Sequence, residues 1–150
     1  MATFTSNSEA ETMTLGEQWG REAQPGWVFA LSGPLGAGKT QLVRGIARGL
    51  GAEARLRSPT FALVHEYKGG RCPLFHLDLF RIESEPEFES AGLGEYLFSL
   101  EGVTAIEWFE HWPDGVRPAK PLFVGARLRR AAIEVLDGNR RRIVYEDTCA

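Results

Sequence analysis

The sequence is poor in cysteine, has little excess of either charge and carries no long hydrophobic run. Its two cysteines, Cys72 and Cys149, match neither a disulfide framework nor a paired metal-ligand motif, so free thiols in a reducing compartment are expected. The net charge of −3 does not favour attraction of the whole molecule to nucleic acid or to an anionic membrane. No basic region precedes an apolar core at the N-terminus, and no apolar run reaches membrane-spanning length. We therefore expect a cytoplasmic protein without a membrane partner.

The chain has the length of one domain. With 150 residues and 43% hydrophobic content, a chain of this kind can bury about two thirds of its unfolded surface in a single core. No internal repeat or low-complexity linker divides it. We therefore expect one domain over residues 1–150, with frayed ends at residues 1–7 and at the last few positions.

One stretch, residues 33–40, has the full pattern of a phosphate-binding loop, G-x-x-x-x-G-K-[ST]. Its glycines let consecutive backbone N–H groups converge on phosphate oxygens, and the N-terminus of the following helix adds partial positive charge. Lys39 would reach the β- and γ-phosphates, and the Thr40 hydroxyl would take one position on Mg²⁺. The nucleotide-binding residues predicted from this loop are Gly33, Gly36, Ala37, Gly38, Lys39 and Thr40.

The segments around the loop suit this prediction. Residues 27–31 have the composition of a buried strand, and residues 39–50 carry apolar side chains at helical spacing, with Gly51 as a C-cap. An earlier helix is predicted to begin at Ser8, in a capping-box arrangement, with Thr12 facing outward. Strand, loop and helix thus follow one another in the order that a phosphate site requires.

The rest of the chain predicts strands joined by turns. Residues 52–57 are expected to be a connection, and residues 84–90 to form short helical turns. The predicted strands are 61–67 and 73–79, paired as a hairpin, followed by 103–106, 122–128, 132–136 and 142–145. The pattern favours an α/β, P-loop NTPase-like fold, with a mixed β-sheet, flanking helices and an antiparallel C-terminal part.

Two carboxylates, Asp78 and Glu107, follow buried strands and would emerge at the ligand edge of the sheet. Either can serve Mg²⁺ or its attacking water. The alternatives are that Asp78 pairs with Arg81 or caps the next turn, and that Glu107 lies on the rim. Thr60, which follows a rigidifying proline, can sense the third phosphate or be a plain turn hydroxyl.

Other side chains also allow more than one interpretation. Trp108 could stack on a base or a partner, or belong to the core. The histidines lack metal-ligand spacing, with His76 expected at a sheet edge and His111 in a loop. The arginines of residues 127–130 and 140–142 could meet RNA or an acidic protein face, or lie on a solvated edge strand that guards against aggregation.

Four motifs, in this order and spacing, resemble the TsaE family: the phosphate loop, SPTF at 58–61, HLDLFR at 76–81 and IEW at 106–108. The loop alone is shared by many families, whereas the combination is specific. The resemblance runs from about Thr12 to Trp108. It implies a bacterial P-loop ATPase that takes part in making threonylcarbamoyladenosine (t6A) at position 37 of tRNAs that read codons beginning with A. Residues 109–113 depart from the proline or short acidic turn that many members place after the tryptophan.

The resemblance implies ATP and Mg²⁺ as cofactors. Lys39 and the loop backbone would bind the ATP phosphates, and Thr40 and Glu107 would ligate Mg²⁺. Trp108 would lie beside the nucleotide, and Thr12 corresponds to a first-helix position that approaches it.

The resemblance also implies how the site is used. Thr60 would lie in a switch-like loop, and Asp78 in the Walker-B-like position, supporting the metal or the water. The implied partners are TsaD and TsaB, on whose engagement turnover depends, with tRNA met only through that complex. The family itself transfers no threonylcarbamoyl group.

Two other functions remain open from the sequence. A small-molecule or nucleotide kinase also uses a short P-loop domain, but no obvious Arg-rich lid segment is present, and the predicted hairpin of residues 61–79 stands where a kinase usually has helices. A non-hydrolysing scaffold would use ATP only to order residues 58–61 for docking.

Overall fold

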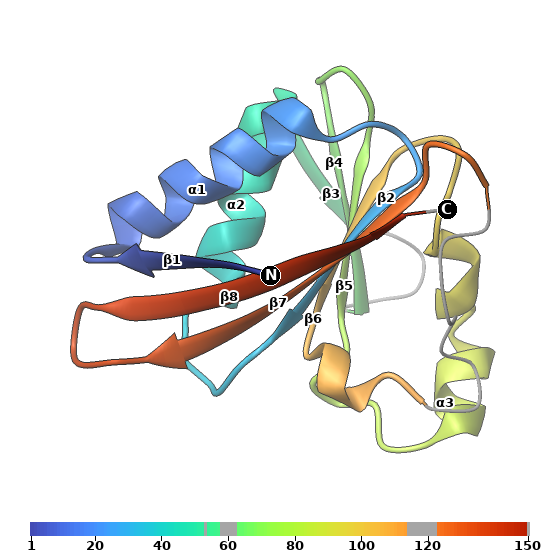
Figure 1. Cartoon of the computed structure of the whole chain (residues 1–150). Helices are drawn as coiled ribbons and strands as arrows, with labels where there is room; N and C mark the ends of the chain where they lie inside the picture. Colours follow the sequence, from blue (N-terminus) through green and yellow to red (C-terminus); the bar gives the residue numbers. More distant parts are fainter. Residues whose placement is uncertain (53, 58–62, 114–122, 150) are drawn as a thin grey trace.

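The computed structural model describes residues 1–52, 54–57, 63–113 and 123–149 (Figure 1). Its helices are α1 (Glu9–Glu22), α2 (Lys39–Leu50) and α3 (Glu85–Ser90), with the 3-10 helices η2 (Leu93–Tyr96) and η3 (Phe109–His111). Its strands are β1 (Ala2–Ser6), β2 (Trp27–Ser32), β3 (Ala54–Arg57), β4 (Val64–Lys68), β5 (Leu74–Asp78), β6 (Val103–Glu107), β7 (Arg127–Val135) and β8 (Arg141–Cys149). In the described part of the chain these strands form one sheet, in the order β1-β8-β7-β2-β6-β5-β4-β3.

The centre of the sheet is parallel and both ends are antiparallel. β2 pairs in parallel with β6 and β7, and β6 pairs in parallel with β5. The pairs β3–β4, β4–β5, β7–β8 and β8–β1 are antiparallel. The predicted mixed sheet with an antiparallel C-terminal part is therefore confirmed. The carboxyl ends of β2, β5 and β6 meet at one edge, where ligands of open α/β sheets bind.

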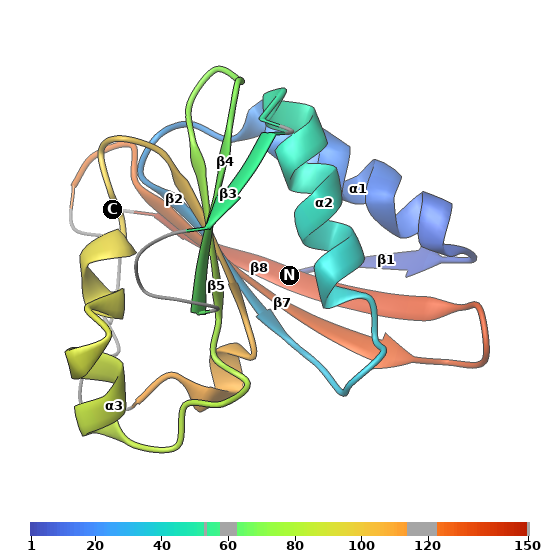
Figure 2. The same ribbon diagram turned by 180° about the vertical axis from the view of Figure 1, so that it is seen from behind.

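Helices cover both faces of the sheet. Figures 1 and 2 show α1 and α2 together on one side and α3 on the other. Neighbouring residues of β2 point to opposite faces, so Phe29 packs into the core beneath α1 and α2, and Val28 into the core on the α3 side. Both are fully buried, as expected for a central parallel strand. The phosphate loop therefore leaves a strand that is held from both sides.

The helices α1 and α2 touch through glycine. Gly16 and Gly20 of α1 meet Gly45 and Gly49 of α2. A Cβ atom added at Gly45 would lie 2.3 Å from the carbonyl oxygen of Met13, so no larger residue fits without separating the helices. Because α2 begins at the phosphate loop, this contact between backbones fixes the direction in which its N-terminus points.

The first helix begins as predicted, but its orientation differs. Ser8 is the N-cap, and its side chain accepts the N–H of Glu11 at 3.1 Å. Thr12 is buried, and its Oγ1 lies 2.7 Å from Oγ of Ser6. The prediction that Thr12 faces outward was wrong, because β1 packs beside the first turn of the helix and takes the place of solvent.

Both ends of the chain are more ordered than the sequence indicated. Residues 2–6 pair with β8, from Ala2 opposite Tyr145 to Ser6 opposite Arg141. At the other end, β8 continues to Cys149 and pairs with β7 along its length. The predicted fraying of residues 1–7 and of the last few residues was therefore wrong for these strands. Their order comes from pairing between distant segments, which the polar N-terminal sequence does not reveal.

Two further predictions of secondary structure need correction. The expected connection at 52–57 contains β3, which pairs with β4 at the edge of the sheet. The segments 122–128 and 132–136 were predicted as separate strands, whereas one strand, β7, runs from Arg127 to Val135. The charged pair Arg129 and Arg130 interrupts the apolar pattern there without interrupting the strand. The predicted hairpin corresponds to β4 and β5, and α3 lies within the predicted helical turns.

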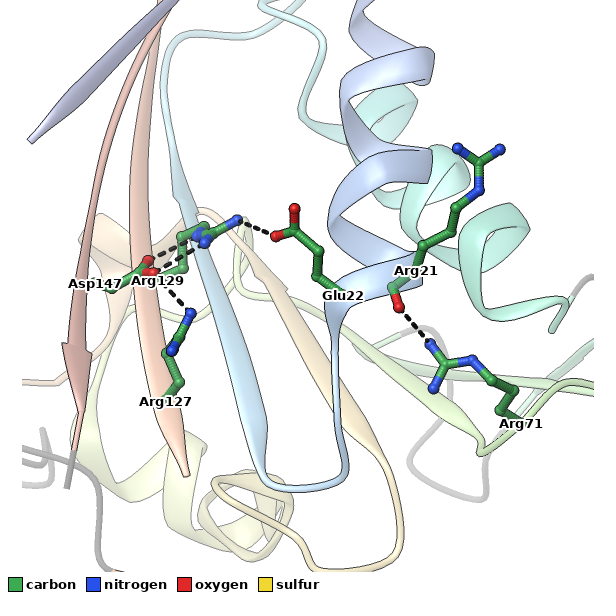
Figure 3. A network of polar contacts seen from close by, with 6 residues as sticks. All are labelled: Arg21, Glu22, Arg71, Arg127, Arg129 and Asp147. Carbon is green, nitrogen blue, oxygen red and sulfur yellow. Dashed lines mark hydrogen bonds and ion pairs between the residues drawn. The ribbon is translucent and has the colours of Figure 1, made fainter. Parts of the chain in front are cut away.

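Arg129 of β7 carries a charge that is buried, and Figure 3 shows its contacts. Its Nε and Nη2 donate to the two carboxylate oxygens of Asp147 on β8, at 2.7 and 2.9 Å. Glu22 of α1 lies 3.8 Å away, and Arg127 donates to Asp147 at 3.2 Å. Because β7 lies between β8 and β2, the alternative that the arginines of residues 127–130 lie on an edge strand was wrong.

Arg71, in the turn between β4 and β5, holds the C-terminal end of α1. Its Nη2 donates to the backbone carbonyl of Gly20 at 2.6 Å. It also donates to the carbonyl of Arg21 at 3.3 Å (Figure 3). The last carbonyls of a helix lack partners within the helix, and a guanidinium supplies them. The hairpin is thereby tied to the helix that packs against α2.

The cysteines are free thiols, as predicted, with Cys72 buried and Cys149 exposed. Within the residues that the structure describes, no helix combines the length and the apolar character needed to cross a membrane.

We expect Asp147→Asn to lower the free energy of unfolding by about 1–2 kcal/mol near neutral pH, since the buried guanidinium of Arg129 would keep a weaker partner. The hydrogen bonds from Arg129 hold the pKa of Asp147 below its ordinary value, although burial opposes them. A carboxyl with a lowered folded-state pKa stabilises the fold above its unfolded-state pKa, and this contribution is lost as pH falls through the folded-state pKa. Urea unfolding of the wild type and of Asp147→Asn should therefore show a difference in the free energy of unfolding that becomes smaller in acid.

The matched control is Asp137→Asn, because Asp137 pairs with Arg140 on an exposed turn. We expect a much smaller change in this variant. The ion pair would not be the source of the stabilisation if Asp147→Asn were as stable as the wild type. The same would follow if the difference in the free energy of unfolding were equal at neutral pH and in acid.

Candidate nucleotide-binding site

The phosphate loop joins β2 to α2 and turns on its glycines. Gly36 and Gly38 have φ angles of +79° and +106°, a region that residues with side chains rarely adopt. The N–H of Ala37 donates to the carbonyl of Pro34 at 3.1 Å. Among the described residues, the N–H groups of Gly36 and Gly38 have no protein acceptor. The loop therefore has unpaired donors at the start of a helix, which is what an anion needs.

Lys39 lies over the loop. Its side chain is almost entirely buried, and Nζ donates to the carbonyls of Gly33 and Pro34, at 2.5 and 3.0 Å. The same ammonium lies 3.8 Å from the ring centroid of Trp108. Burial lowers the pKa of Lys39 below its ordinary value, and the charges of Glu110, Glu107 and Asp78 offset this only in part. The cation is thus held at the loop by carbonyl groups and an aromatic face.

Thr40, Glu107 and His76 form a chain of polar contacts beside the loop. The Thr40 hydroxyl donates to Oε1 and Oε2 of Glu107, at 3.0 and 3.1 Å. Nε2 of His76 lies 2.5 Å from Oε2 of the same carboxylate. Glu107 and His76 are both nearly fully buried, so the alternative that Glu107 is a rim residue was wrong. The structure brings the two predicted Mg²⁺ ligands together.

Glu107 is held in the charged form. Burial alone would raise the pKa of this carboxyl, but hydrogen bonding and the charge of His76, the Thr40 hydroxyl and the Lys39 ammonium together lower it. A buried carboxylate that already accepts a hydroxyl is the kind of hard oxygen pair that Mg²⁺ prefers. These residues therefore fit a nucleotide-bound magnesium ion.

Asp78 and Trp108 line the same cavity, of about 350 Å³, with the phosphate loop and Glu107. One Asp78 oxygen accepts the N–H of Phe80 at 3.0 Å, so this carboxylate caps the following turn while facing the site. Trp108 has a φ of +59°, an uncommon conformation for a residue with a large side chain, and its ring packs against Phe80 at 4.9 Å between centroids. Trp108 thus forms a wall of the cavity.

The two predicted threonines differ in what the structure says of them, because it describes Thr12 and not Thr60. A Cβ atom added at Gly38 would lie 3.8 Å from Cγ2 of Thr12, and a smaller cavity of about 100 Å³ is lined by Thr12, the loop and the turn between β7 and β8. Thr12 therefore lies beside the phosphate loop. Thr60 lies outside the described residues, so its role as a sensor of the third phosphate stays a prediction.

Three residues of this site were missed by the sequence reasoning. His76 was expected at a sheet edge, but it is buried on β5, an interior strand, and contacts Glu107. Its position two residues before Asp78 on one strand, hence on the same face, was the available signal. Oε2 of Glu110 accepts the N–H of Gly33 at 3.2 Å, and Arg141 donates to the carbonyls of Gly36 and Ala37.

Comparison with known proteins agrees with the four motifs. The family model described as "Threonylcarbamoyl adenosine biosynthesis protein TsaE" matches residues 6–142. The chain belongs to the TsaE family. The match extends past Trp108, where the motifs end, through the turn between β7 and β8 to Arg142.

Curated members of the TsaE family, each named "tRNA threonylcarbamoyladenosine biosynthesis protein TsaE", are similar to this chain. The Nostoc protein is 44% identical over 73% of this chain and 68% of its own length, and that of Bacillus subtilis is 44% identical over 69% and 63%. These alignments span about two thirds of each relative. The Aquifex aeolicus protein is 35% identical over 91% of this chain and 89% of its own. The crystal structure of Bacillus subtilis YdiB has a TM-score of 0.74 and 27% identity over 99% of this chain and 86% of that one.

Proposed function

We propose that this protein binds ATP with Mg²⁺ and hydrolyses it in support of t6A formation at position 37 of tRNAs that read ANN codons. One observation carries the proposal: Lys39, Thr40 and Glu107 converge on one cavity beside a loop with unpaired amide groups. Membership of a family named for threonylcarbamoyl adenosine biosynthesis supports the role in tRNA modification.

In this proposal each residue has a defined task. The N–H groups of the loop bind phosphate oxygens, and Lys39 exchanges the carbonyls of Gly33 and Pro34 for the β- and γ-phosphates. Thr40 and Glu107 hold Mg²⁺, which when bound neutralises charge that develops on the phosphate oxygens. Asp78 or Glu107 orients the attacking water, and His76 fixes the orientation of the Glu107 carboxylate.

We further propose that the chain works in the cytoplasm with TsaD and TsaB and transfers no threonylcarbamoyl group itself. ATP turnover would be slow in the isolated protein and would depend on those partners. Contact with tRNA would be made only through the complex.

The experiment that tests this function is steady-state ATP hydrolysis by the purified protein, alone and with TsaB plus TsaD. We expect the partners to stimulate hydrolysis at least about tenfold, a change of about 1.4 kcal/mol in the activation barrier. The blank is Lys39→Ala with the same partners. If the partners leave the rate unchanged, partner-dependent ATPase activity is excluded, and a screen of phosphate acceptors then tests for a kinase.

A further inference from the structure

The hairpin of β7 and β8 reaches the phosphate loop through one side chain, Arg141. Nε of Arg141 donates to the carbonyl of Ala37 at 3.1 Å, and Nη2 donates to that of Gly36 at 3.2 Å. Nη1 donates to the carbonyls of Asp137 at 2.9 Å and of Arg140 at 3.0 Å, within the hairpin turn. One guanidinium therefore joins two segments of the chain that lie about a hundred residues apart.

The contacts of Arg141 act on the peptide groups that make up the loop. The carbonyl of Ala37 belongs to the same peptide group as the N–H of Gly38, which has no protein acceptor among the described residues. A cation at the carbonyl end polarises the peptide and strengthens the N–H as a donor, since linked hydrogen bonds reinforce one another. The carbonyl of Gly36 shares its peptide with the N–H of Ala37, which closes the turn on Pro34. Arg141 thus touches one peptide that faces the phosphate and one that shapes the loop.

The contacts of Arg141 matter because the two peptide groups that it holds lie next to glycines. Gly36 and Gly38 flank these two peptide groups, and peptides next to glycine rotate easily because no side chain restricts them. Arg141 itself is held firmly, since its backbone lies between Ser6 of β1 and Val135 of β7 in the sheet. The strand β8 thereby restrains two peptide groups that glycine would leave free to rotate.

The charge of Arg141 is not neutralised by an ion pair with a described carboxylate. Within the described ranges, no carboxylate lies within ion-pair distance of Arg141, whereas the neighbouring Arg140 and Arg142 pair with Asp137 and Glu134. Among the described residues, the groups that accept hydrogen bonds from Arg141 are neutral carbonyl oxygens. An uncompensated positive charge therefore stands directly behind the loop.

We propose that Arg141 is a positioning residue for nucleotide phosphates: it fixes the two peptide groups between Gly36 and Gly38 and strengthens the Gly38 N–H as a phosphate donor. This inference rests on the proposed function, since it assigns the phosphate groups of ATP and ADP to that loop. Arg141 does not touch the phosphates. It acts through the backbone of the loop.

The test is calorimetric binding of ADP and of inorganic tripolyphosphate to the wild type and to Arg141→Ala. We expect Kd to rise about tenfold for both ligands, since the supported donor contacts phosphate alone. In NMR spectra of the free protein, the Gly38 amide proton should move to lower chemical shift, which a general loss of stability would not produce. Arg141→Lys keeps the charge but not the two-pronged contact, and should weaken binding about threefold.

The matched control is Arg142→Ala, which removes an exposed arginine one position along β8 that pairs with Glu134. It should bind both ligands like the wild type. Unchanged Kd in a folded Arg141→Ala would overturn the proposal even if its melting temperature fell. Should that variant not fold, Arg141→Lys decides, and wild-type affinity there overturns the proposal. If the wild type binds neither ATP nor ADP, the proposed ATP site itself is wrong, which is a different failure.

Discussion

Replacing Lys39 with alanine is expected to abolish tight ATP binding, with Kd rising by roughly a hundredfold or more. The Nζ atom lies at the loop, and within the described part of the chain it contacts the neutral carbonyls of Gly33 and Pro34 and the ring of Trp108. A phosphate group offers a charged acceptor in their place. The change can be followed by calorimetry and by the fluorescence of the tryptophans, of which Trp108 lies beside the ammonium.

The control for this variant is Lys68→Ala. Lys68 ends β4 and forms an exposed ion pair with Glu66, so its loss should leave ATP affinity unchanged. An Lys39→Ala protein that binds ATP as tightly as the wild type would refute the phosphate-loop interpretation of residues 33–40.

The second large effect is expected for Glu107→Gln. We expect Mg²⁺-dependent ATP hydrolysis to fall by roughly a hundredfold or more, because the amide removes the charge that would hold the ion. Glutamine keeps the shape of the side chain and an oxygen that can still accept the Thr40 hydroxyl. Affinity for ADP in the presence of a chelator should therefore change by no more than about threefold. The rate of ATP hydrolysis and the affinity for ADP in the presence of the chelator are to be measured on the same preparations.

Glu101→Gln is the control, since Glu101 is exposed in the loop before β6. It should match the wild type in both assays. Equal losses of turnover and of metal-free affinity in Glu107→Gln would mean that the carboxylate supports the loop structurally and does not hold a metal.

The parts of the site that the sequence predicted are those encoded by short stretches of chain. The phosphate loop needs specific residues at fixed spacing between a strand and a helix, and Lys39 and Thr40 follow from that pattern alone. Asp78 and Glu107 were found because each follows an apolar run, and their strands are direct neighbours in the sheet. Local pattern was therefore sufficient for the residues of the candidate site that lie on one loop and at the ends of adjacent strands.

The residues that were missed or misplaced depend on contacts between distant segments. Thr12 was expected to face solvent because helical periodicity cannot show that β1 covers that turn of α1. Arg141 had the composition of a charged strand, and nothing in its neighbours indicates that its guanidinium contacts a loop 105 positions earlier. His76 could have been found from its alternation with Asp78. Thr12 and Arg141 could have been placed only with knowledge of which strands are neighbours in the sheet.

The strand β1 has a consequence for handling the protein. With residues 2–6 in place, β8 is covered along part of its outer side, and the edge of the sheet is a short segment. Removing those residues would leave the outer edge of the nine-residue strand β8 unpaired along its whole length, a template to which a second copy of the chain could add. The same cut would take away Ser6, and with it the hydroxyl that orients Thr12 beside the phosphate loop. We therefore expect that loss of these five residues would both favour association between copies of the chain and disturb the candidate nucleotide site.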